Sequence, residues 1–284
     1  MTATIVSGFV AEGTSEGQPV ACYDLTSSEQ CDGEALELVQ ADYFKTRGGD
    51  PSAIVAVVFA PSTDDADYGL RFVAAHGPLG GCGEATLFAT AMCTNPSTDP
   101  AVTFETAAGV IVGRNLSSGR VAVDMPAVAR TSVRQQVDYL GRPLRIRSAS
   151  AGGNRFAAVT ASDLGIQLDR FSFHELTVAG HDLLSRLRGP ASDIPAPDML
   201  LITEPVTGLS TRSAVVWGDG VLNRGPCGTG TCVRYVLAVE DGEVCAGAPL
   251  VHASPFGHSF EAQSIGSGTI DQLDIMLSGL VTMD

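Results

Sequence analysis

Residues 222–231 read Leu222-Asn223-Arg224-Gly225-Pro226-Cys227-Gly228-Thr229-Gly230-Thr231, which places a cysteine in a loop rich in glycine and threonine. A strand-like run, Ser213–Trp217, precedes this loop, and a helix-like apolar run, Val233–Val239, follows it. The pattern predicts that Cys227 lies in a strand-to-helix turn, at the N-terminus of the helix. A helix N-terminus offers unpaired backbone N–H groups and a partial positive charge, which favour a thiolate and bind carboxylate or phosphate groups.

The same design occurs about half a chain earlier. Residues 80–86 read Gly-Gly-Cys-Gly-Glu-Ala-Thr, so the stretches around Cys82 and Cys227 both fit the pattern Gly-x-Cys-Gly-x-x-Thr. The first copy also follows a strand-like run, Tyr68–Ala75, and precedes a helix-like run, Leu87–Met92. Two half-chains with the same local design predict two similar lobes that face each other.

The composition limits the classes of function. The chain has 284 residues, of which 44% are hydrophobic and 17% charged, so it is expected to be globular. Its net charge of −15 argues against nucleic acid or an anionic membrane as a partner, because both need a basic surface. No targeting segment and no stretch of about 18 apolar residues is visible, so we expect a cytoplasmic protein.

The seven cysteines are odd in number and scattered in spacing, which predicts neither a disulfide framework nor a structural zinc site in a reducing compartment. Outside the two loops, a cysteine is expected to be a small buried apolar side chain. This expectation applies to Cys22, Cys31, Cys93, Cys232 and Cys245.

Two such turns on opposite sides of a cleft would provide two acid/base thiols and an anion-binding cradle. One thiolate would remove the α-proton of a bound acid, and the opposite thiol would deliver a proton to the other face of the carbon. The glycines would let the substrate approach the backbone, and the hydroxyls of Thr86 and Thr231 could add hydrogen-bond donors. Neither loop has the lysine of a phosphate-binding loop. No histidine lies within a recognisable Cys-His signature (His76, His174, His181, His252 and His258).

The two cysteine loops resemble motifs of the proline racemase / hydroxyproline epimerase family. That family has Met-Cys-Gly-His-Gly-Thr around its first catalytic cysteine and Asp-Arg-Ser-Pro-Cys-Gly-Thr-Gly-Thr around its second, and residues 81–86 and 223–231 correspond to these motifs. Weaker similarity follows the family order at Thr14–Pro19, Glu105–Gly109, Gly152–Ala157 and Gly257–Phe260.

The resemblance implies an α/β (α+β) fold with two similar lobes, each a β-barrel-like sheet around a central helix, and an active-site cleft between them. It implies that Cys82 and Cys227 are the catalytic acid/base pair, that no metal or other cofactor is needed, and that the partner is a small carboxylic or amino acid. A homodimer is also in keeping with the family. The backbone stretches that match the family's carboxylate-binding residues are Gly83, Thr86, Gly228, Thr229, Gly230 and Thr231.

Two positions depart from the family pattern beside the expected substrate amine. Glu84 replaces the family's histidine, and Asn223 replaces its aspartate, so a carboxylate is lost on one side and gained on the other. Glu84 could hold a substrate ammonium group and should disfavour a nearby thiolate. We therefore expect Cys82 to rest as a thiol and Cys227 as a thiolate. The family's Glu-Pro-Arg-Gly-His element is also replaced, by Lys45–Gly49.

The expected N-terminal lobe covers residues 1–127, ending after a strand at Gly119–Met125 with a turn at Pro126, and 273–284 would complete it. The expected C-terminal lobe covers 128–272. It would contain a strand at Leu144–Ala151, a turn at Gly152–Gly153, a helix at Phe171–Arg188 and a loop at Gly189–Pro197, and the last strand would be Leu273–Val281.

Four functions stay open on these residues. The first is a cofactor-independent racemase or epimerase acting on proline, hydroxyproline or a related amino acid. The second is an isomerase or dehydratase on the same scaffold, for which Glu84 could serve as a further acid/base. The third is a thiol-nucleophile enzyme such as an acyltransferase, and the fourth is a protein that binds small acids without catalysis.

Overall fold

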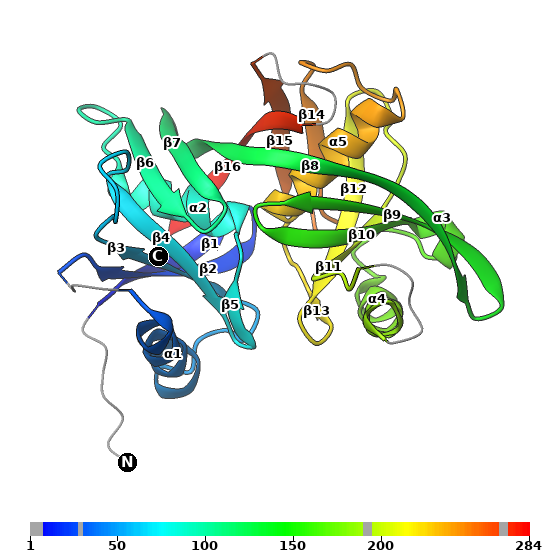
Figure 1. The fold of residues 1–284 in the computed structure, drawn as a ribbon, viewed down its shortest axis with the longest axis horizontal. Helices are drawn as coiled ribbons and strands as arrows, with labels where there is room; N and C mark the ends of the chain where they lie inside the picture. The colour runs from blue at the N-terminus through cyan, green and yellow to red at the C-terminus, as the bar shows by residue number, and fades with distance from the viewer. Residues whose placement is uncertain (1–7, 28–30, 190–194, 267–271) are drawn as a thin grey trace. The chain divides into compact units, whose positions relative to one another are not determined.

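The computed structural model describes residues 8–27, 31–189, 195–266 and 272–284 as a mixed α/β protein (Figure 1). The chain divides into two compact units. Unit 1 consists of Met1–Pro126 and Ser278–Asp284, and unit 2 consists of Ala127–Leu277. Two strands, β8 (Arg120–Tyr139) and β16 (Gln272–Met283), contribute residues to both units.

Unit 1 is a closed ring of eight strands in the order β1-β2-β3-β4-β6-β7-β8-β16. The short strand β5 pairs with β4. Between β2 and β3 the chain forms helix α1 and then, directly after it, the π-helix η1. The bounds of these elements are β1 Phe9–Ser15, β2 Gln18–Leu25, α1 Gly33–Gln40, η1 Ala41–Thr46, β3 Ile54–Phe59, β4 Tyr68–Ala74, β5 Gly77–Leu79, α2 Gly83–Cys93, β6 Ala101–Thr106 and β7 Gly109–Ser117.

The central helix of unit 1 is α2, which contacts β1, β2, β3, β6 and β7. Its residues from Gly83 to Thr90 are all buried, and Leu87, Phe88 and Ala89 are fully buried. The helix is thus buried on every side, and the ring of strands encloses it.

In unit 2 the strand order is β8-β9-β10-β11-β12-β14-β15-β16, and α5 contacts β9, β10, β14 and β15. Every residue of α5 from Gly228 to Ala238 is buried. The bounds are β9 Arg142–Ala151, β10 Asn154–Thr160, α3 Ala161–Leu164, α4 Phe173–Arg188, β11 Met199–Thr203, β12 Ser210–Trp217, β13 Val221–Leu222, α5 Gly228–Glu240, β14 Leu250–Ala253 and β15 Ser259–Ile265.

Helix α4 packs on β11, β12 and β13 through one apolar stripe. Its buried residues recur at helical spacing (Leu176, Gly180, Leu183, Leu184 and Leu187), as expected for an amphipathic helix. At Gly180 a Cβ atom would lie 2.5 Å from Cγ2 of Val216, so only glycine allows this close approach.

The predicted mixed α/β fold is confirmed, and so are most of the predicted elements. The prediction that a strand ends in a turn at Pro126 is wrong, because β8 continues through this residue. The ladder between β8 and β7 ends at Asp124, and the ladder between β8 and β9 begins at Ala129. A proline is tolerated there because its missing N–H falls where the strand changes partners. Of the predicted loop 189–197, residues 190–194 lie outside the described residues.

The expected burial of the other cysteines is only partly correct. Cys22 and Cys232 are buried, Cys31 and Cys93 are half-buried, and Cys245 is exposed. Cys245 lies in the loop between α5 and β14, where no sheet or helix covers it.

Candidate active site

In unit 1, Cys82 is the N-cap residue of α2, directly after the β4–β5 hairpin. Its Sγ accepts a hydrogen bond from the backbone N–H of Ala85 at 3.4 Å. Thr86 closes the turn, because both its backbone N–H and its hydroxyl donate to the carbonyl oxygen of Cys82, at 3.0 and 2.7 Å. The thiol is thus fixed at the positive end of a buried helix.

Glu84 lies in the first turn of the same helix and is almost completely buried. The Cys82 thiol donates to its Oε2 at 3.4 Å. A carboxylate in the first turn is stabilised by the helix dipole. In this contact the thiol is the donor and the carboxyl oxygen is the acceptor.

In unit 2, Cys227 is the N-cap residue of α5 and follows the short β12–β13 pair. Its Sγ accepts from the backbone N–H of Gly230 at 3.4 Å and lies 3.6 Å from the hydroxyl of Thr229. The backbone N–H and the hydroxyl of Thr231 donate to the carbonyl oxygen of Cys227, at 2.7 and 2.8 Å. The two cysteine turns therefore share one hydrogen-bond pattern. In each, a backbone N–H donates to the cysteine sulfur, and a threonine donates to the carbonyl oxygen of the cysteine.

Cys227 differs from Cys82 in its backbone. Its φ is 61°, in the left-handed region, whereas φ at Cys82 is −150°. A side chain in that region costs about 1–3 kcal/mol, and such strain persists only where the surroundings hold it. Gly230 is part of those surroundings: a Cβ there would lie 3.0 Å from Cγ2 of Val215 and 3.3 Å from Sγ of Cys227.

Asn223 is buried at the start of the second loop. Its Nδ2 donates to the carbonyl oxygen of Gly225 at 3.2 Å, and its backbone N–H donates to Val215 in β12. The Asn223 side chain thus bonds to the backbone of its own loop, two residues before Cys227.

A histidine that the sequence did not single out supports the second loop. His252 in β14 is fully buried, and its Nδ1 lies 2.6 Å from the hydroxyl of Thr231. Because that hydroxyl donates to Cys227, Nδ1 carries the proton and donates to it. Burial, helped by the nearby Arg234 guanidinium, lowers the pKa of His252 to about 3, so the ring is neutral at pH 7. Its Nε2 is buried with no hydrogen-bond partner among the described residues.

Each set of predicted site residues is brought together within its own unit. Cys82, Gly83, Glu84 and Thr86 form the turn into α2. The turn into α5 contains Cys227, Gly228, Thr229, Gly230 and Thr231, with Asn223 just before it. The hydroxyls of Thr86 and Thr231 close these turns, which is a different use from the substrate donors that the sequence suggested.

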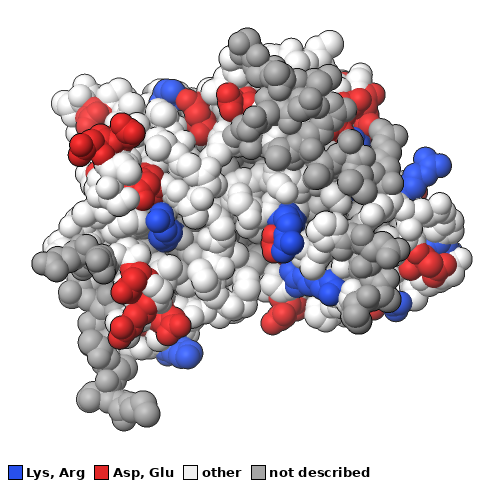
Figure 2. Space-filling model, viewed as in Figure 1, with Lys and Arg blue, Asp and Glu red and all other residues white. Residues whose placement is uncertain are grey.

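The surface carries no strong basic feature on the face that Figure 2 shows. Among the described residues there, lysine and arginine side chains form only small groups, in keeping with the net charge of −15. Within the described ranges, no helix is both long and apolar enough to cross a membrane. The same residues include no group of three histidine, cysteine or acidic side chains placed to hold a metal ion.

Fold and site together define a class of α/β protein in which each of two units has a central helix capped by a cysteine. The chain belongs to the proline racemase family, whose model, described as "Proline racemase", matches residues 33–278.

Named relatives support this assignment. A proline racemase of Clostridioides difficile is 28% identical over 235 residues, which cover 74% of this chain and 68% of the relative. A 4-hydroxyproline epimerase of Brucella ovis is 24% identical over 288 residues, covering 90% of this chain and 86% of the relative. The fold is similar to that of a hydroxyproline epimerase from Agrobacterium vitis solved with bound trans-4-hydroxy-L-proline, with a TM-score of 0.80, 18% identity, and coverage of 98% and 89% of the two chains.

Proposed function

We propose that this chain is a cofactor-independent amino-acid racemase or epimerase that acts on proline, hydroxyproline or a close analogue through Cys82 and Cys227. The observation that carries the proposal is the shared geometry of the two cysteines, each held at a helix N-terminus with a backbone N–H on its sulfur. Membership of the proline racemase family supports the same activity.

In the proposed reaction, one sulfur removes the α-proton as a base and the other sulfur returns a proton to the opposite face of the carbon. The C–H bond breaks as an S–H bond forms, and the second S–H bond breaks as the new C–H bond forms, so no electrons are lost or gained. The free N–H groups at the start of a helix suit the substrate carboxylate, whose negative charge grows during proton removal. Gly83 and Gly228, the first residues of α2 and α5, are the proposed donors.

The surroundings of the two sulfurs support unequal resting states. Cys82 donates to the Glu84 carboxylate, which favours the thiol. Cys227 has the Thr229 hydroxyl at 3.6 Å and the Gly230 N–H at 3.4 Å, and both groups can donate to a thiolate. We propose that Cys227 is the base at rest and that Cys82 is the acid.

The ionisation states can be tested by iodoacetamide alkylation followed by mass spectrometry across pH. Cys227 should react faster than Cys82 at neutral pH, and the reaction of Cys82 should rise only at higher pH. Faster alkylation of Cys82 at neutral pH would contradict the assignment.

The activity is tested by α-proton exchange in D2O, followed by NMR and chiral chromatography, with proline and the hydroxyproline isomers. We expect exchange with inversion in the native protein and loss of inversion in Cys82→Ser and Cys227→Ser. Cys245→Ser is the matched control, because Cys245 is exposed and outside both loops. Inversion that survives in both loop variants would refute the two-thiol mechanism.

A second candidate activity is an isomerase or dehydratase reaction on the same scaffold, and the contact of Glu84 with Cys82 favours it as an additional proton carrier. An unsaturated product in the same exchange experiment would indicate this reaction. Binding without exchange would indicate a small-acid-binding protein. A homodimer is part of the proposal on family grounds alone, and light scattering on the purified protein would measure it.

A further inference from the structure

Unit 2 contains a cavity of about 660 Å³ that none of the cysteine-loop residues lines. Its walls come from β8, β9, β10, α3, the end of β11 and the C-terminal half of α5, with Arg234, Leu237 and Asp241 contributed by or next to that helix. Cys227 caps the other end of α5, and Arg234 lies seven residues further along the helix, about 10 Å along its axis. The cavity is therefore separate from the Cys227 loop, and its volume is in the ordinary range for small-molecule sites.

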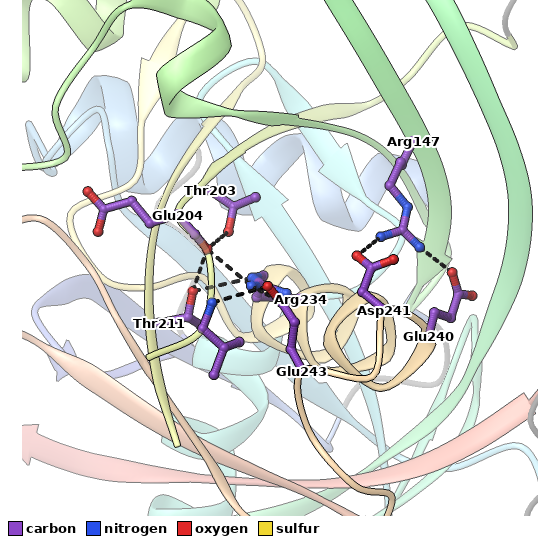
Figure 3. A network of polar contacts seen from close by, with 9 residues as sticks. Arg147, Thr203, Glu204, Thr211, Arg234, Glu240, Asp241 and Glu243 are labelled. Carbon is purple, nitrogen blue, oxygen red and sulfur yellow. Dashed lines mark hydrogen bonds and ion pairs between the residues drawn. The ribbon is translucent and has the colours of Figure 1, made fainter. Parts of the chain in front are cut away.

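The deepest charged group in this cavity is Arg234, which is 3% exposed. Its Nε donates to the Thr211 hydroxyl at 3.3 Å, and its Nη2 donates to the Glu204 carbonyl at 3.1 Å and to Glu243 Oε2 at 2.7 Å (Figure 3). Among the described residues, Nη1 has no hydrogen-bond partner. A buried guanidinium normally has its donors satisfied, so Nη1 is available to a ligand that accepts hydrogen bonds.

A second arginine is locked in place nearby. Arg147 in β9 is bonded by Glu240 and Asp241 at the end of α5, as Figure 3 shows. These ion pairs link β9 to the C-terminal end of α5, and they engage both Nη atoms of Arg147. Two charged side chains at the exposed rim, Arg145 and Asp163, have no ion pair among the described residues.

The charges of the cavity select the class of ligand. The described side chains that line it include three guanidinium groups and four carboxylates, and one of these carboxylates, Glu204, is paired with Arg212 at 3.8 Å. The charges are therefore close to balanced, and a simple anion would add an unbalanced negative charge. The carbonyl end of α5 at the same wall acts in the same direction. A zwitterion adds no net charge: its carboxylate can accept from Arg234 and Arg145, and its ammonium group can pair with Asp163.

We propose that this cavity is a second small-molecule site of the protein, which binds a free amino acid as a zwitterion and is separate from the two cysteine loops. Arg234 Nη1 holds the carboxylate at the base, and Arg145 and Asp163 complete the site at the rim.

Binding is measured by isothermal titration calorimetry on the full chain carrying Cys82→Ser and Cys227→Ser, so that turnover through the thiols does not contribute. L-proline is the probe, and cyclopentanecarboxylate is its match in size without the ammonium group. We expect L-proline to bind and cyclopentanecarboxylate to bind at least several-fold more weakly. Equal binding of the two, or no binding of L-proline, would overturn the proposal.

Variants then place the binding site. Arg234→Lys keeps a positive charge beside Glu243 but removes the Nη1 donors, and we expect about a tenfold loss of affinity for L-proline. Arg145→Gln and Asp163→Asn, both at the exposed rim, should weaken binding several-fold without affecting folding. Arg142→Gln is the control, because Arg142 is exposed on the same strand but does not line the cavity. Affinity that is unchanged in all three cavity variants would refute the proposal. The exchange test in the native protein is independent of this result.

Discussion

The buried His252 should make the stability of unit 2 depend on pH in the acid range. Burial holds its pKa at about 3 in the folded protein, compared with 6.5 for an exposed histidine. Below pH 6.5 the unfolded state therefore binds one more proton than the folded state, and the free energy of unfolding falls as the pH falls. The loss is about 1.4 kcal/mol per pH unit, so lowering the pH from 7 to 5 costs about 2 kcal/mol at this one residue.

The experiment compares the native protein with His252→Asn, since Asn retains a donor for the Thr231 hydroxyl but does not titrate. Urea unfolding is followed by the fluorescence of Trp217, the single tryptophan, which lies on β12 next to the strand that carries His252. The difference in unfolding free energy between the two proteins should shrink by about 2 kcal/mol between pH 7 and pH 5.

The comparison cancels the titration of all other groups, since they are common to both proteins. His174→Asn is the control, because this histidine is exposed at the start of α4 and stays in water in both states. A difference between the native protein and His252→Asn that is the same at both pH values would refute the reasoning.

Three further changes have defined outcomes. Glu84→Gln removes the carboxylate that Cys82 contacts, so alkylation of Cys82 at neutral pH should become several-fold faster, as mass spectrometry would show. Gly230→Ala brings a methyl group 3.0 Å from a neighbouring valine, so we expect a loss of about 1–3 kcal/mol in urea unfolding and an altered alkylation rate for Cys227. Arg47→Met leaves the buried carboxylate of Asp42 without its ion pair, which should cost about 3 kcal/mol in circular-dichroism melts, and adding Asp42→Asn should recover part of that loss.

The two cysteine turns could be predicted because the information that forms them is local. A capping side chain, the N–H groups that it meets and the threonine that closes the turn all lie within five consecutive residues, as at 82–86 and 227–231. The enclosed helices α2 and α5 were visible for the same reason, as apolar runs that follow the turns.

Features that depend on distant partners could not be predicted. His252 meets Thr231 from 21 residues away, because β14 pairs with β12, and no sequence pattern marks that register. Pro126 was expected to form a turn, but it lies where β8 stops pairing with β7 and starts pairing with β9, and this change of partner is not visible in the sequence. The cavity at Arg234 likewise needs the loop at Glu204 and the acidic end of α5 to meet, which only the folded sheet achieves.

The last strand has a consequence for folding during synthesis. Residues 278–284 belong to unit 1, where β16 pairs with β1 and the N–H of Val281 donates to Gly119 at 2.9 Å. The unit that is translated first is therefore completed last, after nearly all of unit 2 has been made. Until then β1 and the start of β8 keep an open edge that can pair with other strands. The nascent chain should be most prone to aggregation, and most dependent on chaperones, just before residues 278–284 are added.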